Sequence, residues 1–290
     1  MKKLFVFCAV SLFLCGEAFA QYTYQSVAYL GGDLTRLLGI NNQGEVAGAY
    51  RITPPRHAVL YSRGAFQALD PAGVLGADFS EAWAVNERGD VVGRYLDDFG
   101  NEHGFLYQGG SLITLDVPFP SIQTDAYDIN ASGDVVGGFA DPQGFVHGFL
   151  YSKGVYKQID YPGAVDTLPL GINARGDVVG DWDTDPTTLG HGFVLSHGSF
   201  ATFDHPNAAP YSTYFVGISD NGSMSGLYLD ATGALHNFVK SKKSLTELLV
   251  PGADAMNTVG HINASGQVVG TYISHGQQTG YVATPAKKGK

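Results

Sequence analysis

The chain has 290 residues, and its 27 acidic side chains outnumber its 17 basic ones, for a formal net charge of −10. Proteins that bind nucleic acid or an anionic lipid surface need clustered basic side chains, and here the positive charges are scattered along the chain. We therefore expect neither nucleic acid nor an anionic membrane surface as a partner.

The first twenty residues have the three parts of a secretory signal peptide. Lys2 and Lys3 form a charged start, residues 4–14 form an apolar core, and Ala18-Phe19-Ala20 is an A-x-A cleavage site. The apolar core is too short to span a bilayer. We therefore expect cleavage after Ala20, a mature chain that starts at Gln21, and a secreted or periplasmic monomer without membrane insertion.

Both cysteines, Cys8 and Cys15, lie in this leader. The exported chain would then have no disulfide, no thiol nucleophile and no cysteine metal ligand. A lipid anchor on Cys15 is the alternative to a cleaved peptide, but Leu14 stands where a lipoprotein signal needs a small residue. Packing alone must then stabilise the mature chain.

Six copies of one unit follow, and a turn glycine recurs in them at spacings of 45, 44, 43, 46 and 44 residues. These turn glycines are Gly44, Gly89, Gly133, Gly176, Gly222 and Gly266. A second glycine follows four residues later in each copy, and an aromatic residue stands two positions beyond it. The aromatic residues are Tyr50, Tyr95, Phe139, Trp182, Tyr228 and Tyr272. A register that holds through six copies indicates a repeat architecture.

The third copy, residues 126–164, contains four short apolar runs separated by turn signals. Asn130 can accept hydrogen bonds from its own turn, and Gly133 can take the positive φ that this turn requires. The apolar runs after this turn are residues 135–136, 147–151 and 155–161. Four strands in about forty residues leave no room for a helix, so we expect an all-β fold.

Four strands per unit at this period are typical of propeller blades, and a parallel β-helix is the alternative. The two ends of the chain favour the propeller. The sixth copy stops after its third strand, at residues 281–284, while residues 24–41 align without a gap with residues 156–173. The N-terminal segment Tyr22–Leu30 would thus supply the missing fourth strand, which removes the open edges of a ring.

The mature chain is then a single domain. We expect a six-bladed β-propeller over residues 21–285, closed by the pairing of its N-terminal strand with the C-terminal blade. Residues 286–290 are expected to be a disordered tail.

The motif set INxxGDVVG, HGFLY and DxPGA resembles the bacterial extracellular HAF repeat family, which is named after a recurring His-Ala/Gly-Phe triplet. The resemblance covers residues 22–284. It implies a secreted, propeller-like protein and no shared catalytic residues. The fifth copy departs most from the pattern, with Ser219 for Asn, Met224-Ser225 for Val-Val and His236-Asn-Phe for His-Gly-Phe, so we expect an irregular fifth blade.

Several polar and aromatic residues recur in equivalent places. Five histidines could suggest a metal ring, and they are His57, His103, His147, His191 and His236. Identical placement is what packing or a repeated hydrogen bond produces, whereas a metal site needs convergent ligands. Asp116, Asp160 and Asp204 each precede an X-Pro pair and are expected to cap the turn after the fourth strand. Trp83 and Trp182 are expected in the core.

A binding site should lie where the copies differ, in the loops from second to third strand and from fourth strand to the next copy. These loops share one propeller face and are rich in Asp, although Asp is also an ordinary turn residue. The candidate ligand-binding residues are Asp97, Asp98, Asp183, Asp185, Tyr211 and Tyr214.

Asp181, Asp183 and Asp185 alternate along the chain and could offer oxygen ligands to calcium. The calcium-binding loop needs glycine at its sixth position and an acid at its twelfth, where this chain has Pro186 and Gly192. A hairpin enlarged by one residue explains the pattern more simply. We expect no cofactor, with calcium as the alternative.

Sequence signals for catalysis are weak. The chain has no Gly-x-Ser-x-Gly, HExxH or phosphate-binding glycine loop. The glutamates of the mature chain are Glu45, Glu81, Glu87, Glu102 and Glu247, and none stands in a context that marks a tuned acid. Arginines are absent from the fifth and sixth copies, so we do not expect a central arginine clamp for an anionic sugar.

We therefore expect a secreted, non-catalytic binding scaffold for an extracellular glycan or protein. The alternative is a glycan-active hydrolase or lyase with its site on the loop face, for instance with Asp97 opposed to Asp183. No catalytic residue can be named from the sequence.

Overall fold

The computed structural model describes residues 21–52, 54–69, 79–185 and 190–286. The expected signal peptide, residues 1–20, and the last four residues of the expected tail lie outside this range. Ala286, at the start of that tail, donates its backbone N–H to the carbonyl of Gln21 over 2.9 Å. In the part of the chain that is described, no helix is long and apolar enough to cross a membrane.

The described residues form twenty-four strands and no helix, which confirms the all-β expectation. Five units consist of four consecutive antiparallel strands. Unit one is β2 (Leu34–Ile40), β3 (Val46–Arg51), β4 (His57–Ser62) and β5 (Ala65–Ala68). Unit two is β6 (Ser80–Val85), β7 (Val91–Leu96), β8 (Glu102–Gln108) and β9 (Ser111–Leu115). Unit three is β10 (Gln123–Ile129), β11 (Val135–Ala140), β12 (Val146–Ser152) and β13 (Val155–Ile159).

The second half of the chain repeats this arrangement. Unit four is β14 (Asp166–Ile172), β15 (Val178–Asp183), β16 (His191–Ser196) and β17 (Ser199–Phe203). Unit five is β18 (Thr213–Ile218), β19 (Met224–Leu229), β20 (Leu235–Lys240) and β21 (Leu245–Leu248), so the expected irregularity does not alter its strand count. Unit six is β22 (Ala255–Ile262), β23 (Val268–Ser274), β24 (Gln277–Pro285) and the N-terminal strand β1 (Tyr22–Val27).

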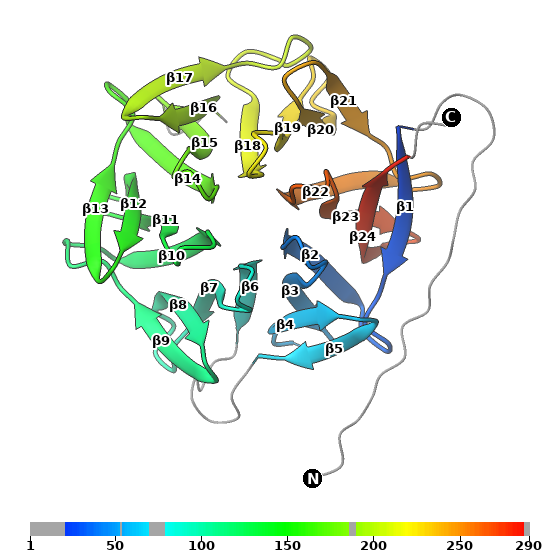
Figure 1. The fold of residues 1–290 in the computed structure, drawn as a ribbon, viewed down its shortest axis with the longest axis horizontal. Coiled ribbons are helices and arrows are strands. Elements are labelled where there is room, and N and C mark those ends of the chain that lie inside the picture. Colours follow the sequence, from blue (N-terminus) through cyan, green and yellow to red (C-terminus); the bar gives the residue numbers. More distant parts are fainter. Residues whose placement is uncertain (1–20, 53, 70–78, 186–189, 287–290) are drawn as a thin grey trace.

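The units are arranged radially around one axis, with the first strand of each unit innermost and the fourth outermost (Figure 1). Because neighbouring strands are antiparallel, the turns between first and second strands lie on one face, here called the turn face. The other face, called the loop face, carries the second-to-third connections and the fourth-to-first connections.

Strand β1 completes unit six as the sequence predicts. It pairs antiparallel with β24, from Tyr22 opposite Pro285 to Val27 opposite Gly280. Ser26 lies opposite Tyr281, within the segment that was expected to be its partner. The first and last strands of the chain therefore lie side by side in one sheet.

The predicted turn chemistry is present between β10 and β11. Gly133 has a φ of 87°, and the Asn130 side-chain oxygen accepts hydrogen bonds from the backbone N–H groups of Ser132 (2.9 Å) and Asp134 (3.0 Å). The same asparagine also binds across units, because its side-chain N–H donates to the Asn173 carbonyl at 3.2 Å. A turn that is local in sequence thus also joins two units.

These asparagines form most of a ring on the turn face. The bonds run from Asn41 to the Asn86 carbonyl (3.0 Å), from Asn86 to the Asn130 carbonyl (3.2 Å), and from Asn263 back to the Asn41 carbonyl (3.0 Å). Ser219 replaces asparagine in unit five, where Asn221 instead reaches the Ala264 carbonyl at 2.8 Å. The departure of the fifth copy therefore alters this ring.

The second recurring glycine is explained by a β-bulge in the inner strand of every unit. In unit two, a Cβ on Gly93 would overlap the carbonyl oxygen of Glu81, and the corresponding glycines meet the same carbonyl position in the other units. Bulges re-aim side chains and often adjoin functional sites, and here they lie among the residues that face the axis.

The recurring histidines have the expected structural role. Each packs against the recurring aromatic residue of its unit, as in Trp182 with His191, which stack at 4.8 Å between ring centroids. Trp182 also stacks on Tyr161 at 4.0 Å. Asp116, Asp160 and Asp204 differ from expectation, because their carboxylates contact the Nδ1 atoms of the recurring histidines at 2.7–3.0 Å.

Candidate functional site

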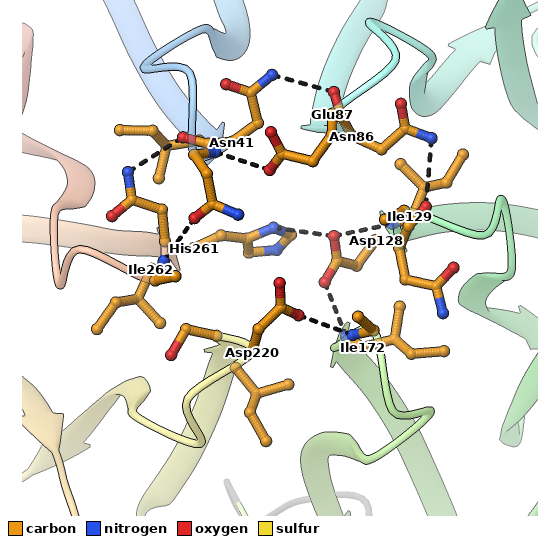
Figure 2. Close-up of a pocket in the computed structure, with 18 of the residues that line it drawn as sticks. Asn41, Asn86, Glu87, Asp128, Ile129, Ile172, Asp220, His261 and Ile262 are labelled. Atoms are coloured by element: carbon orange, nitrogen blue, oxygen red, sulfur yellow. Dashed lines mark hydrogen bonds and ion pairs between the residues drawn. The ribbon is translucent and has the colours of Figure 1, made fainter.

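Two hollows lie along the axis, at different levels. A small pocket of about 60 Å³ is surrounded by the turns of the turn face (Figure 2). A larger hollow of about 300 Å³, called the axial cavity, is lined by inner-strand residues from all six units and by single residues of β15 and β19. Its lining residues are Arg36, Leu38, Trp83, Tyr127, Leu168, Leu170, Asp181, Tyr214, Val216, Leu227, Thr258 and Val259.

An acid and a histidine meet across the axis at the small pocket. The Nδ1 atom of His261 lies 3.3 Å from an oxygen of Asp128 (Figure 2). The Asp128 carboxylate also accepts the backbone N–H groups of Ile129 (2.8 Å) and Ile172 (2.7 Å). The equivalent residues of the other units are small, namely Gly39, Ala84, Gly171 and Gly217. Along the inner strands, Asp128 and His261 lie between the residues that line the small pocket and those that line the axial cavity. This buried pair therefore separates the two hollows.

The axial cavity is built at positions where the six copies differ. The fifth residue before the turn asparagine, or before Ser219 in unit five, is Arg36, Glu81, Asp125, Leu168, Tyr214 and Thr258 in order along the chain. The residue after the second recurring glycine is Ala49, Arg94, Gly138, Asp181, Leu227 and Thr271. When equivalent positions of a repeat protein carry unlike side chains, the repeat itself does not require a particular residue there. Such positions can therefore hold residues that bind a ligand.

Three arginines converge on one buried glutamate beside the axial cavity. The Glu81 side chain is fully buried, and its carboxylate accepts hydrogen bonds from Arg36 Nη1 (2.7 Å), from Arg94 Nη2 (2.9 Å) and from Arg56. Burial acts to raise the pKa of Glu81, but the three positive charges outweigh burial and hold that pKa below its ordinary value. The sequence did not single out Glu81, and the arginines converge here on a side chain of the same chain.

A second carboxyl group, that of Asp125, lies behind Tyr127, and its pKa is shifted in the opposite direction from that of Glu81. Asp125 is buried and accepts the Tyr127 hydroxyl hydrogen at 3.0 Å. Burial, followed by the nearby charge of Glu102, raises the pKa of Asp125 to about 7 even though Arg94 opposes the shift. The cavity thus has unlike carboxyl groups close behind one wall.

Asp181 lines the cavity from unit four, the neighbour of the unit that carries Tyr127 and Asp125. It is 7% exposed, and its Oδ1 atom is buried without a hydrogen-bond partner in the described part of the chain. Burial, and then the charges of Asp183 and Asp166, raise the pKa of Asp181 well above its ordinary value. Burial and the Asp166 charge also raise the pKa of Asp183, to about 6.

Two further lining residues carry buried polar atoms that have no partner among the described residues, the Trp83 indole N–H and the Thr258 hydroxyl. Buried polar groups in folded proteins are nearly always hydrogen-bonded, because leaving one unpaired is costly. With the Asp181 oxygen, three such atoms belong to residues that line one hollow. They are suited to bind a molecule that carries hydroxyl or carbonyl groups.

The sequence-predicted residues divide into two groups. Tyr214 lines the axial cavity, and Asp183 lies on β15 two residues beyond Asp181. Tyr211 is half exposed and makes an edge contact with His191, with ring centroids 5.0 Å apart, and Asp185 is exposed beyond the end of β15.

Asp97 and Asp98 lie in the turn between β7 and β8 and do not line the axial cavity. Asp97 accepts the backbone N–H groups of Phe99 and Asn101, each at 2.8 Å, while Asp98 is exposed. Hydrogen bonding from Asn101, above all from its side chain, lowers the pKa of Asp97 to about 2. Asp97 is therefore an ordinary turn residue, which was the alternative to a role in ligand binding.

The alternative of a calcium site at Asp181, Asp183 and Asp185 has no support among the described residues. No group of three or more His, Cys, Asp and Glu side chains there is placed to hold a metal ion. Asp181 and Asp183 are buried whereas Asp185 is exposed, so the three carboxylates do not converge.

One pattern in the sequence marks the cavity residues that sequence reasoning missed, which are Arg36, Glu81, Trp83 and Tyr127. They appear when the six inner strands are aligned at the third and fifth residues before the turn asparagine. The loops, where function was sought, are more conspicuous because they vary in length as well as in sequence.

Asp125 gives a testable pH dependence of stability. Its carboxyl has a pKa near 7 in the folded chain and about 3.9 when unfolded, so the folded state holds a proton that the unfolded state releases across this window. Ionised Asp125 therefore destabilises the fold increasingly as pH rises from 4 to 7. We expect Asp125→Asn to raise the free energy of unfolding by about 4 kcal/mol at pH 8 and to have a smaller effect at pH 4.5.

Urea denaturation of the parent and the variant at both pH values measures this difference. Asp98→Asn, the same change at an exposed site, is the control and should have little effect at either pH. A gain for Asp125→Asn that is equal at pH 8 and pH 4.5 would contradict the assignment.

No protein-family model matches this sequence, and a search of curated proteins found no match. Solved structures are similar in fold. XC5397 from Xanthomonas campestris, a gluconolactonase, is 11% identical with a TM-score of 0.56 over 98% of both chains. A mutant of the lectin from Aleuria aurantia, solved with α-methyl-L-fucoside, is 10% identical with a TM-score of 0.55 over 88% of this chain and 91% of the lectin.

The sialidase of Trypanosoma rangeli is 10% identical with a TM-score of 0.55, and the match covers 90% of this chain but 56% of the sialidase. At such low identities the likeness shows the fold alone. This chain is an all-β protein with a β-propeller fold, which lectins and enzymes share.

Proposed function

We propose that the protein is an exported, six-bladed β-propeller that binds one sugar unit of a glycan in its axial cavity. The six four-stranded units are the blades, and the pairing of β1 with β24 supports closure of the ring. Lectins are among the proteins of similar fold, which is compatible with a binding role.

The observation that carries the proposal is that three residues lining the cavity have unpaired buried polar atoms, the Trp83 indole N–H, the Asp181 oxygen and the Thr258 hydroxyl. A sugar offers many hydroxyl groups that can pair with them. Trp83 and Tyr127 also present aromatic surface, with ring centroids 5.0 Å apart in an edge contact. A few placed polar groups among aromatic and aliphatic side chains are typical of ligand sites, and the cavity of about 300 Å³ lies at the small end of their range.

The tryptophans provide a direct test, since the chain contains only Trp83 and Trp182. We expect a glycan identified on an array to change the fluorescence of the protein, and Trp83→Phe to abolish this change and weaken binding about tenfold. Trp182→Phe is the matched control, because Trp182 stacks between Tyr161 and His191 away from the cavity lining. A titration in which Trp83→Phe binds as tightly as the parent would place the site elsewhere.

Hydrolysis is the second candidate function, and the unlike carboxyl groups favour it. Asp125 and Asp181 have raised pKa values while the pKa of Glu81 is lowered, and enzymes separate acid and base roles in this way. Cleavage of a bound glycan that stops in Asp181→Asn, with binding retained, would support an enzyme. Binding without cleavage supports the scaffold.

A further inference from the structure

We propose that the axial cavity selects an acidic sugar, a hexuronic acid whose carboxylate pairs with Arg36. This inference rests on the proposed sugar site and adds the chemical class of the ligand. It replaces the sequence-based expectation that no arginine clamp could be built near the axis.

Arg36 is the one arginine that lines the cavity, and much of its hydrogen-bonding capacity is unused. Its Nη1 atom donates to Glu81 at 2.7 Å, and no other N–H of the Arg36 guanidinium has a partner within the described residues. Its side chain is 17% exposed, so it is held by Glu81 and still reachable from the cavity. A guanidinium fixed on one edge and open on another matches a carboxylate ligand.

The surroundings of Arg36 are short of negative charge. Arg36, Arg56 and Arg94 share the Glu81 carboxylate, and Arg94 Nη1 also donates to Glu102 at 2.6 Å. Three guanidinium groups thus face two carboxylates. Asp125, 4.0 Å from Arg94, adds charge only when it is ionised, because burial and Glu102 raise its pKa to about 7. A ligand carboxylate would supply the missing negative charge.

The opposite wall carries complementary groups for sugar hydroxyls. Arg36 belongs to unit one and Asp181 to unit four, and these units face each other across the axis (Figure 1). The unpaired Asp181 oxygen of that wall can bind a hydroxyl, and the indole N–H of Trp83, in unit two beside unit one, can donate to another. A hexuronic acid has a carboxylate at one end of its ring and hydroxyls at the other, so one ring can pair with both walls.

The test compares methyl glucuronide with methyl glucoside, and methyl galacturonide with methyl galactoside, by isothermal titration. We expect at least one acidic sugar to bind about tenfold more tightly than its neutral counterpart, since a charge-assisted pair adds about 1.5 kcal/mol or more. Arg36→Gln, which can keep a hydrogen bond to Glu81, should remove this preference. Arg63→Gln, an exposed turn arginine, is the matched control and should keep the preference.

The possible outcomes separate the two proposals. Equal affinity for acidic and neutral sugars, or a preference that survives Arg36→Gln with an unchanged melting temperature, overturns the acidic-sugar inference while the sugar site stands. Binding of none of the four glycosides, nor of any acidic or neutral glycan on an array, overturns the proposed function and this inference together.

Discussion

A chain that lacks residues 22–30 is expected to melt about 10 °C or more below the full-length mature protein. Strand β1 contributes six paired residues to unit six, and Val27 at its end is fully buried. Without β1, β24 becomes an open edge and the hydrophobic cluster of unit six is uncovered. We expect the loss to be on the order of 5 kcal/mol, as for a missing repeat interface, which corresponds to the stated shift in melting temperature for a domain of this size.

Differential scanning calorimetry of the truncated and full-length chains measures this effect. Leu30→Ser in the full-length chain is the control, since Leu30 is 64% exposed just after the strand. A synthetic peptide of residues 21–30, added to the truncated chain, should restore part of the stability. An unchanged melting temperature on truncation would refute the ring.

Glu81→Gln is expected to lower the free energy of unfolding by about 3 to 5 kcal/mol. The substitution leaves the guanidinium groups of Arg36, Arg56 and Arg94 without the buried carboxylate that they share. When one partner of a buried ion pair is removed, the remaining charges stay buried without a counter-charge, and their desolvation is no longer compensated. The pKa of Glu81 is held below its ordinary value, so its stabilising effect is present above pH 4.5 and is lost as pH falls further.

Urea denaturation at pH 7 compares Glu81→Gln with Glu87→Gln. Glu87 accepts the backbone N–H of Asn42 at 2.8 Å in an exposed turn, and a glutamine can keep that bond, so its change should have an effect below about 1 kcal/mol. Equal stability of Glu81→Gln and the parent would show that the arginines do not depend on this carboxylate.

The fold could be predicted from the sequence because its signals are local. The turn of Asn130 and Gly133, the following strand and the next turn all lie within a few residues of each other. The same pattern recurs in all six copies. The N-terminal strand was predicted as well, because Tyr22–Leu30 keeps the pattern of a fourth strand although it stands at the other end of the chain.

The site could be predicted only in small part, because its residues converge through the ring. Arg36, Glu81 and Arg94 lie in two different units, and their scatter along the sequence conceals their contact. Which side chains of an inner strand face the axis also depends on the bulge, which the sequence does not show directly. Tyr214 was predicted as a ligand-binding residue and lines the cavity, but it was chosen as a loop residue.

The position of β1 has a consequence for the order of events during folding. The Thr23 hydroxyl donates a hydrogen bond to the Thr284 carbonyl over 3.3 Å, and the two residues are 261 positions apart in the chain. Strand β1 is therefore synthesised long before its partner β24. Each inner unit can fold from neighbouring segments, but closure must wait for the C-terminal residues and for a loop of nearly the whole chain to close. Until then Tyr22–Val27 lacks its partner strand, and the sheet of unit six stays incomplete.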